Sequence, residues 1–228
     1  MKSVAIWTLN IPNNGIPYLP KLCEITHKSI SEYAQRIGAD FNIITQRKFP
    51  AWPVTYEKMQ LYELGTEYED NLLVDSDLLI REDFPDFRNI IPKQNIGLYT
   101  AFDADKFYAP DKYFLRDGRK IGCSATMIYS SDFTHDIWTP LEISFEEARS
   151  NIKFDYNIDE YCISRNLARF GLKISGLFSD PDMIYHLDAT TATLDKSIRT
   201  DNSEDKLVKL ALNKLGDWEN ARTNNIAN

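Results

Sequence analysis

The chain has 228 residues, 43% of them hydrophobic and 12% aromatic, and a formal net charge of −8. This length suits one large domain, or one domain with a small appendage, with a core that needs no disulfides. The negative charge disfavours nucleic acid as the main partner, whereas a small anionic substrate is compatible if a metal supplies positive charge. The cysteines Cys23, Cys123 and Cys162 are far apart and lack metal-ligand spacing, so we expect reduced core thiols.

The amino terminus carries no export signal that we can identify. Residues 1–7 form too short an apolar run for a signal peptide, and no stretch approaches the length of a membrane span. We therefore expect a soluble, cytoplasmic protein of bacterial or viral type, whose oligomeric state the sequence does not specify.

The first half of the chain alternates strand and helix patterns. The predicted elements are a strand at 4–9, a helix at 19–37 ended by Gly38, a strand at 41–45, a helix at 56–64 and a strand from 71. Because a strand, a helix and a second strand follow one another twice, the pattern is typical of a parallel sheet.

The second half predicts shorter elements. They are strands at 95–101, 124–129 and 172–177, a polar helix or loop at 142–151, a helix at 158–170 ended by Gly171, and an apolar stretch at 183–187. Residues 103–120 form a long polar loop, and such loops are usually lids or binding segments. In the tail, Asp201 and Glu204 resemble a capping box, and Gly216 predicts the end of the helix.

These elements predict an α/β domain over residues 1–190, with a mixed, mainly parallel sheet flanked by helices. Residues 191–228 form a helical tail in this prediction, packed on the domain or on a partner. No internal repeat and no low-complexity segment interrupts the pattern.

Two acids follow the third predicted strand, as Asp75-Ser76-Asp77. An unpaired buried carboxylate costs several kcal/mol, and a divalent cation with oxygen ligands offsets this cost. Side chains at i and i+2 of an extended chain point to the same side, so both acids can face one ion. Since open α/β sheets bind ligands at the carboxyl ends of their strands, we expect a metal site facing a crevice.

Four other residues are candidates for the same crevice. Lys58 lies on the helix before the acidic strand, where it is either a surface lysine or a cation that reaches a phosphate or a sugar. Asp159 is in the first turn of a late helix, where the helix dipole alone would favour an acid, and Asp155 precedes it. His186 follows a late apolar stretch, where it is either a hydrogen-bonded histidine or a ligand.

The order of these motifs resembles that of metal-dependent GT-A (Rossmann-like) glycosyltransferases, the nucleotide-diphospho-sugar transferases. The most similar are the glycogenin, lipopolysaccharide galactosyltransferase and plant xylosyltransferase families. The resemblance rests on Tyr56-x-Lys58, a helix, and then Asn71-Leu-Leu-Val-Asp75-Ser-Asp77-x-x-Ile80. The stretch 122–129 resembles their Asn-Ser-Gly-Val-Met strand without keeping the Asn-Ser-Gly letters. Order and spacing match over residues 1–188.

The resemblance implies roles for individual residues. Asp75, Asp77 and His186 would hold Mn²⁺ or Mg²⁺, and Asp159, Asp155 and Lys58 would be the catalytic group. The nucleotide sugar, expected to be a UDP-sugar, would be bound by Trp7, Thr8, Asn10, Lys58, Asp75 and Ser76.

We therefore expect a metal-dependent enzyme that transfers a sugar to a glycan or another hydroxyl acceptor, by retention or inversion. One alternative is a sugar-1-phosphate nucleotidyltransferase, but residues 10–17 hold one Gly and no basic residue, unlike a triphosphate-binding loop. The other is a non-catalytic, metal-dependent carbohydrate-binding module on the same fold.

Overall fold

The structure is a computed structural model that describes residues 2–12, 18–99, 101–103, 121–177, 182–187 and 203–226. Its centre is a six-stranded sheet with the order β2-β1-β3-β8-β5-β9. These strands are β1 (Lys2–Leu9), β2 (Asp40–Ile44), β3 (Tyr68–Val74), β5 (Asn95–Leu98), β8 (Met127–Ser131) and β9 (Lys173–Leu177). β1 is parallel to β2 and β3, and β5 is parallel to β9, whereas β8 is antiparallel to β3 and β5. The predicted mixed, mainly parallel sheet is confirmed.

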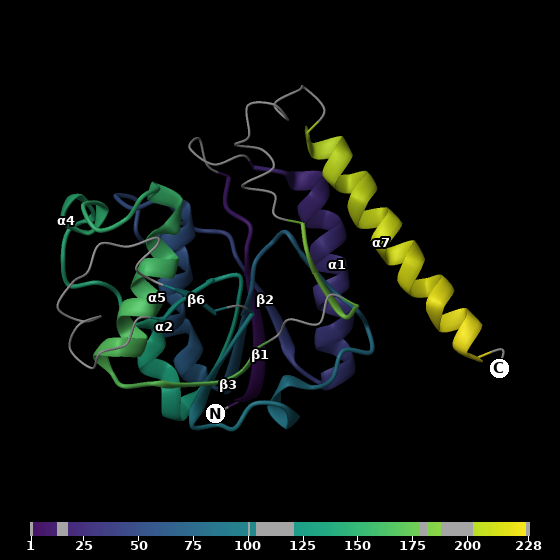
Figure 1. Cartoon of the computed structure of the whole chain (residues 1–228), viewed down its shortest axis with the longest axis horizontal. Helices are drawn as coiled ribbons and strands as arrows, with labels where there is room; N and C mark the ends of the chain where they lie inside the picture. Colours follow the sequence, from purple (N-terminus) through teal and green to yellow (C-terminus); the bar gives the residue numbers. More distant parts are fainter. Residues whose placement is uncertain are drawn as a thin grey trace.

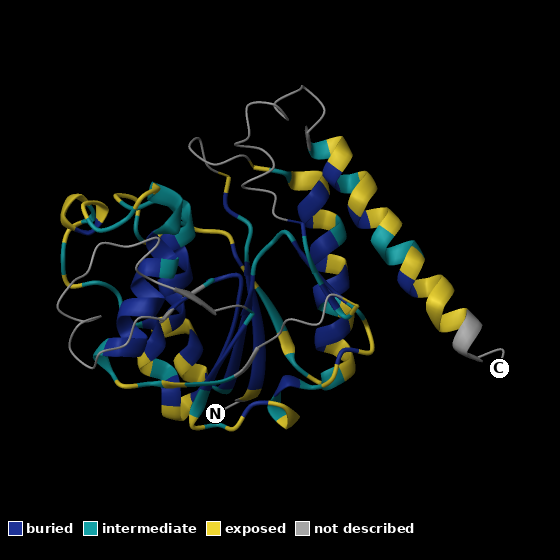
Figure 2. Cartoon of the chain, viewed as in Figure 1, coloured by how far each residue is buried: buried dark blue, intermediate teal, exposed yellow. Residues whose placement is uncertain are grey.

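Helices cover both faces of the sheet (Figure 1). One face carries α1 (Pro20–Ile37), and the other carries η1 (Val54–Gln60), α2 (Leu61–Leu64), η5 (Asp132–Trp138) and α5 (Ile158–Arg169). Successive side chains of β3 point to opposite faces of the sheet, so Leu72 and Val74 pack with α1 while Leu73 packs with α5. All three are fully buried, as Figure 2 shows for the centre of the sheet, and each stabilises the fold by about 1.5–3 kcal/mol.

Shorter elements complete the domain. They are β4 (Leu78–Ile80) paired with β10 (Ile184–His186), β6 (Ala101–Asp103) paired with β7 (Ile121–Cys123), η2 (Gly65–Glu67), η3 (Phe87–Asn89), α4 (Phe145–Arg149) and η6 (Asp155–Asn157). Of the described side chains, Cys23 and Cys162 are buried free thiols, as predicted. No helix in the described ranges is long and apolar enough to cross a membrane.

The predicted helix at 56–64 is mostly a 3₁₀ helix, followed by one α-helical turn in α2. The periodicity of the sequence did not distinguish these forms. Tertiary contacts fix the stretch, because the buried Glu57 carboxylate accepts from the Arg47 guanidinium at 2.6 Å and from the Lys48 amide at 2.9 Å. Short 3₁₀ helices are common as connectors of this kind.

The prediction that Gly216 ends the tail helix is wrong. Helix α7 (Ser203–Ile226) continues through Gly216 for ten more residues. A glycine inside a helix costs about 1 kcal/mol relative to alanine, and burial of Trp218 two residues later offsets this cost. By contrast, Gly38 and Gly171 have positive φ angles of 69° and 62° and end α1 and α5 as expected.

Helix α7 packs along the outer side of α1 (Figure 1). Leu207, Ala211 and Trp218 form a cluster with Leu22 of α1 and Leu79 of β4. At the start of both helices, a Glu204 carboxylate oxygen accepts from the Lys21 amide at 2.8 Å. Helix α7, the described part of the tail, therefore packs on α1 and β4.

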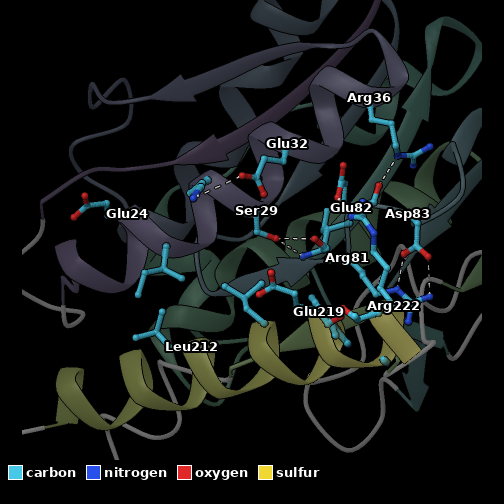
Figure 3. Close-up of a pocket in the computed structure, with 17 residues that line it drawn as sticks. Glu24, Ser29, Glu32, Arg36, Arg81, Glu82, Asp83, Leu212, Glu219 and Arg222 are labelled. Atoms are coloured by element: carbon cyan, nitrogen blue, oxygen red, sulfur yellow. Dashed lines mark hydrogen bonds and ion pairs between the residues drawn. The ribbon is translucent and has the colours of Figure 1, made fainter. Parts of the chain in front are cut away.

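A groove of about 1360 Å³ lies between α1, α7 and residues 80–83. Figure 3 shows that charged side chains of both signs surround it, and Arg222 of α7 reaches Glu82 at 2.7 Å across it. Ser29 of α1 donates to the Ile80 carbonyl at 2.7 Å and so fixes α1 to β4.

Candidate functional site

The Asp75-Ser76-Asp77 turn follows β3 directly, at the carboxyl end of the strand. The Asp75 amide donates to the Thr126 carbonyl at 2.8 Å, and the Leu78 amide donates to the Asp75 carbonyl at 3.2 Å. On the other side, the Thr26 hydroxyl of α1 donates to the Ser76 carbonyl at 2.6 Å. The loop before β8 and helix α1 therefore hold the turn between them, in the position that the sequence predicted.

Lys58 lies at the centre of the site. Its ammonium is 2.6 Å from Asp75 Oδ1 and 2.7 Å from Asp159 Oδ2, and it donates to the Ala125 carbonyl at 3.0 Å. Burial disfavours the charged ammonium, but Asp159 and Asp75 outweigh this effect and raise the pKa of Lys58 above its ordinary value. The alternative of a surface lysine is wrong, because Lys58 is buried at the junction of η1, β3 and α5.

The acidic side chains around Lys58 carry more negative charge than its single ammonium can balance. Burial raises the pKa of Asp75 to about 6, against the lowering effect of Lys58, and the charges of Asp77 and Asp159 raise it further. One ammonium thus pairs with two carboxylates, and the charge of Asp77 acts on Asp75 as well, so a second cation at this place would be electrostatically favourable.

Asp77 and His186 form the second part of the site. His186 Nε2 lies 3.3 Å from Asp77 Oδ2, because β10 pairs with β4 and places His186 opposite Leu78. The Leu187 amide also donates to the Asp77 carbonyl at 2.9 Å. The ring of Tyr99, which follows β5, meets the His186 imidazole edge-on with centroids 5.9 Å apart.

The donor atoms of Asp77 and His186 fit a divalent cation. Two ligands at right angles, each about 2.1 Å from an ion, are about 3 Å apart, close to the separation seen here. A carboxylate and an imidazole are ordinary partners around Mn²⁺. Within the part of the chain that the structure describes, no three His, Cys, Asp or Glu side chains lie close enough to hold a metal. The three-ligand set of Asp75, Asp77 and His186 therefore stays a prediction.

The start of α5 brings further acids to the site. Asp159 is buried against Lys58, whereas Asp155 on η6 is half-exposed and pairs with Arg149 at 2.9 Å. Glu160 was not among the predicted site residues. Burial, and then the charge of Asp159, raises the pKa of Glu160 to about 8, despite a hydrogen bond from Asn157. A carboxyl group that titrates near neutral pH is a candidate acid or base, and the sequence signal for it is the Asp159-Glu160 pair, which resembles an Asp-Gln or Asp-Glu pair of GT-A glycosyltransferases.

The residues predicted for the nucleotide lie at and beyond the end of β1. Trp7 is buried in the core, and its indole N–H donates to the Asn71 amide oxygen at 2.8 Å. The Thr8 hydroxyl is buried and has no hydrogen-bond partner among the described residues. Asn10 accepts a hydrogen bond from the Tyr18 hydroxyl at 2.9 Å. Their roles towards a nucleotide stay predictions, and the packing of Trp7 leaves little of its ring to a ligand.

Ser76 faces α1, where its hydroxyl interacts with the Cys23 thiol. Burial raises the pKa of that thiol to about 11, so it remains protonated at neutral pH. Of the loop predicted to close over a ligand, residues 104–120 lie outside the described residues.

This sheet, with its acidic turn at the end of β3, defines the fold of a GT-A-like glycosyltransferase. Among solved structures, the chain is similar to a glycosyltransferase involved in the glycosylation of the major capsid of PBCV-1. The TM-score is 0.51 at 12% identity, over 87% of this chain and 100% of that one. This likeness shows the fold alone.

Two further structures have lower scores. The bifunctional glycosyltransferase WbbM has a TM-score of 0.46 at 8% identity, over 79% of this chain and 39% of that one. A Drosophila β-1,4-galactosyltransferase 7 mutant, in complex with manganese, UDP-Gal and xylobiose, has a TM-score of 0.43 at 10% identity, over 89% and 79% of the two chains. No protein-family model matches the sequence, and no curated protein matches it significantly.

Proposed function

We propose that the protein is a metal-dependent glycosyltransferase that moves a sugar from a nucleotide-diphosphate sugar, a UDP-sugar, to a carbohydrate or another hydroxyl acceptor. The observation that supports this most directly is the bridge that Lys58 makes between Asp75 and Asp159, beside the Asp77–His186 pair. It joins the acidic turn to α5 at the carboxyl end of a parallel strand, where α/β folds bind their ligands. The likeness to a glycosyltransferase fold supports the same reading.

In this proposal Asp75, Asp77 and His186 hold Mn²⁺ or Mg²⁺. A divalent cation at that place supplies positive charge to both phosphates and to the departing diphosphate. Asp77 and His186 already converge on a common point, and Asp75 is fixed beside them by Lys58. The turn itself is held by Thr26 and Thr126, so its carboxylates need little rearrangement to bind the ion.

Lys58 has a positioning role in this proposal. An ammonium group has three protons, and those of Lys58 are directed to Asp75, Asp159 and the Ala125 carbonyl. None is left for a phosphate oxygen. Lys58 thus holds the two carboxylates in fixed positions, and it supplies the counter-charge that a buried Asp159 needs.

Asp159 and Asp155 face the sugar or the acceptor hydroxyl in this proposal. An inverting enzyme would need one of them as the general base that takes the acceptor proton. Asp155 is the more accessible of the two, with a side chain 47% exposed, whereas Asp159 is 4% exposed. A retaining enzyme would instead use these carboxylates to stabilise the positive charge that develops on the sugar.

A donor panel tests the proposal. Purified protein with Mn²⁺ is incubated with UDP-, GDP- and dTDP-sugars, and the release of the nucleoside diphosphate is measured with and without simple glycosides. We expect release from at least one donor, stimulated by an acceptor and abolished by chelation of the metal. A protein that binds UDP with Mn²⁺ but never turns a donor over would instead be a binding module.

The variant Asp75→Asn tests the metal in the same assay. It should abolish Mn²⁺-dependent UDP binding, because a neutral amide is a poor ligand for a hard cation. Asp83→Asn is the matched control, since Asp83 is exposed and pairs only with Arg81 among the contacts described. Unchanged UDP affinity in Asp75→Asn would remove Asp75 from the site.

A further inference from the structure

A stacked pair of aromatic rings, one exposed and one half-buried, lies beside the site, and the sequence analysis gave it no role. Phe154 and Tyr156 are parallel, with an interplanar angle of 5° and centroids 5.2 Å apart. Phe154 is 42% exposed and does not belong to the hydrophobic core. A single exposed apolar side chain needs no explanation, but a flat aromatic surface held open to solvent is a feature of binding sites.

A hydrogen bond from η1 ties the segment that carries the pair to the site. The Tyr156 carbonyl accepts from the Thr55 hydroxyl of η1 at 3.3 Å. Thr55 lies one turn before Lys58, and Tyr156 lies three residues before Asp159, so both ends of the Lys58–Asp159 bridge are tied to this surface. The segment that carries the two rings joins α4 to the start of α5 (Figure 1), and Asp159 in the first turn of α5 pairs with Lys58.

Polar groups of both signs flank the two rings. The Arg149 guanidinium pairs with Asp155 at 2.9 Å, and the Lys153 ammonium lies 5.2 Å from the Phe154 ring centroid. These side chains are exposed or half-exposed and can exchange partners at low cost. A flat apolar face beside both donors and acceptors suits a neutral ring with many hydroxyls, and neither an anion nor a purely apolar ligand.

We infer that Phe154 and Tyr156 form the acceptor subsite and that the acceptor is a carbohydrate. The C–H face of a sugar ring stacks on the aromatic pair, while Asp155 and Arg149 bind its hydroxyls. The acceptor hydroxyl then points towards Asp159 and the donor. This inference rests on the proposed glycosyl transfer, and it selects a sugar acceptor over other hydroxyl compounds.

Binding of disaccharides tests the subsite without a donor. Maltose, cellobiose, lactose, chitobiose and mannobiose are titrated into the full chain, and dissociation constants are measured by NMR. We expect at least one to bind, and Phe154→Ala to weaken that binding by about tenfold, the size of a lost aromatic stacking contact. Phe154→Tyr keeps a flat ring and should bind like the unmodified protein.

Phe133→Ala is the control for removal of an exposed phenylalanine, since Phe133 on η5 is 66% exposed. Three results would overturn the inference: no disaccharide binds, Phe154→Ala binds as well as the unmodified protein, or Phe133→Ala weakens binding equally. Thermal unfolding of each variant shows whether it is folded. If Phe154→Ala does not fold, Phe154→Tyr remains available for the binding test.

Kinetics separate the subsite from the proposed function. With a donor from the panel, Phe154→Ala should raise the KM for the disaccharide by about tenfold with little change in kcat. If disaccharide binding depends on Phe154 but no donor is ever consumed, the proposed transfer fails and the subsite stands. If transfer occurs with the same acceptor KM in Phe154→Ala, the subsite fails and the transfer stands.

Discussion

Lys58 and Asp159 form a buried ion pair, with Nζ 2.7 Å from Oδ2 and each side chain 4% exposed. The pair connects η1, which precedes β3, to α5 near the end of the domain. Because Asp75 shares the same ammonium, the geometry of the acidic turn depends on a contact with a helix 84 residues further along the chain.

The first prediction concerns this ion pair. Lys58→Met should lower the free energy of unfolding by about 3–5 kcal/mol, because it leaves Asp75 and Asp159 buried without a counter-charge. The double variant Lys58→Met/Asp159→Asn should recover part of this loss. Urea denaturation measures both. Lys28→Met is the control, since Lys28 is exposed and its pair with Glu32 contributes at most about 0.5 kcal/mol.

The second prediction concerns the metal. His186→Ala should weaken the binding of Mn²⁺ by about 10–100-fold, as measured by calorimetry in the presence of UDP, because it removes one ligand of the proposed three. His135→Ala is the matched control, since His135 stacks on Tyr62 away from the acidic turn. Equal Mn²⁺ affinity in the two variants would exclude His186 as a ligand.

The third prediction concerns pH. The pKa of Glu160 is about 8 in the folded protein and 4.5 for an ordinary glutamate, so the folded state holds a proton that the unfolded state releases. The contribution of Glu160 is fully present below pH 4.5 and is lost as pH rises through 8, at up to about 1.4 kcal/mol per pH unit.

Glu160→Gln should therefore flatten the fall in stability between pH 4.5 and about pH 8, the window set by these two pKa values. Urea denaturation at several pH values measures it, with the exposed Glu219→Gln as control. Parallel pH profiles for Glu160→Gln and the unmodified protein would show that Glu160 titrates normally.

The fourth prediction concerns α7. Gly216→Ala should raise the free energy of unfolding by about 0.5–1 kcal/mol, because a Cβ there meets no atom within 4 Å and alanine favours the helix. Gly38→Ala should instead destabilise the protein by about 1 kcal/mol, since its φ of +69° is left-handed. A loss of stability in Gly216→Ala would mean that the helix is bent or broken at this position.

The fold was predictable where local signals agreed. The elements β1, α1, β2 and β3 were predicted in their observed order from three signals. These are turn-forming residues, a helical apolar stripe that ends at Gly38, and the apolar run before Asp75. A strand was predicted at 124–129, but its antiparallel direction and its pairing between β3 and β5 as β8 were not, because strand order depends on contacts distant in sequence. The same holds for Gly216, where packing of Trp218 overrides a local stop signal.

The site was predictable in its residue types more than in its contacts. An Asp-x-Asp after a buried run marks the turn, and position in the chain marks Lys58 and His186 as candidates. Three features of the site depend on tertiary packing and could not be predicted. Lys58 contacts Asp159, and Asp77 rather than Asp75 lies beside His186. The third is the pKa of Glu160, which lies near neutral pH.

The contact of Glu204 with the amino end of α1 has a consequence for shortened versions of the protein. Helix α1 supports the acidic turn through Thr26, while the first-turn amides of Lys21 and Leu22 donate to the Glu204 carboxylate of α7. A fragment that stops at residue 190 would lose that partner and expose Leu22 and Leu79 to water. Helix α7 therefore helps to keep α1, and through it the acidic turn, in place, and expression of residues 1–190 alone should yield a less soluble and less ordered product.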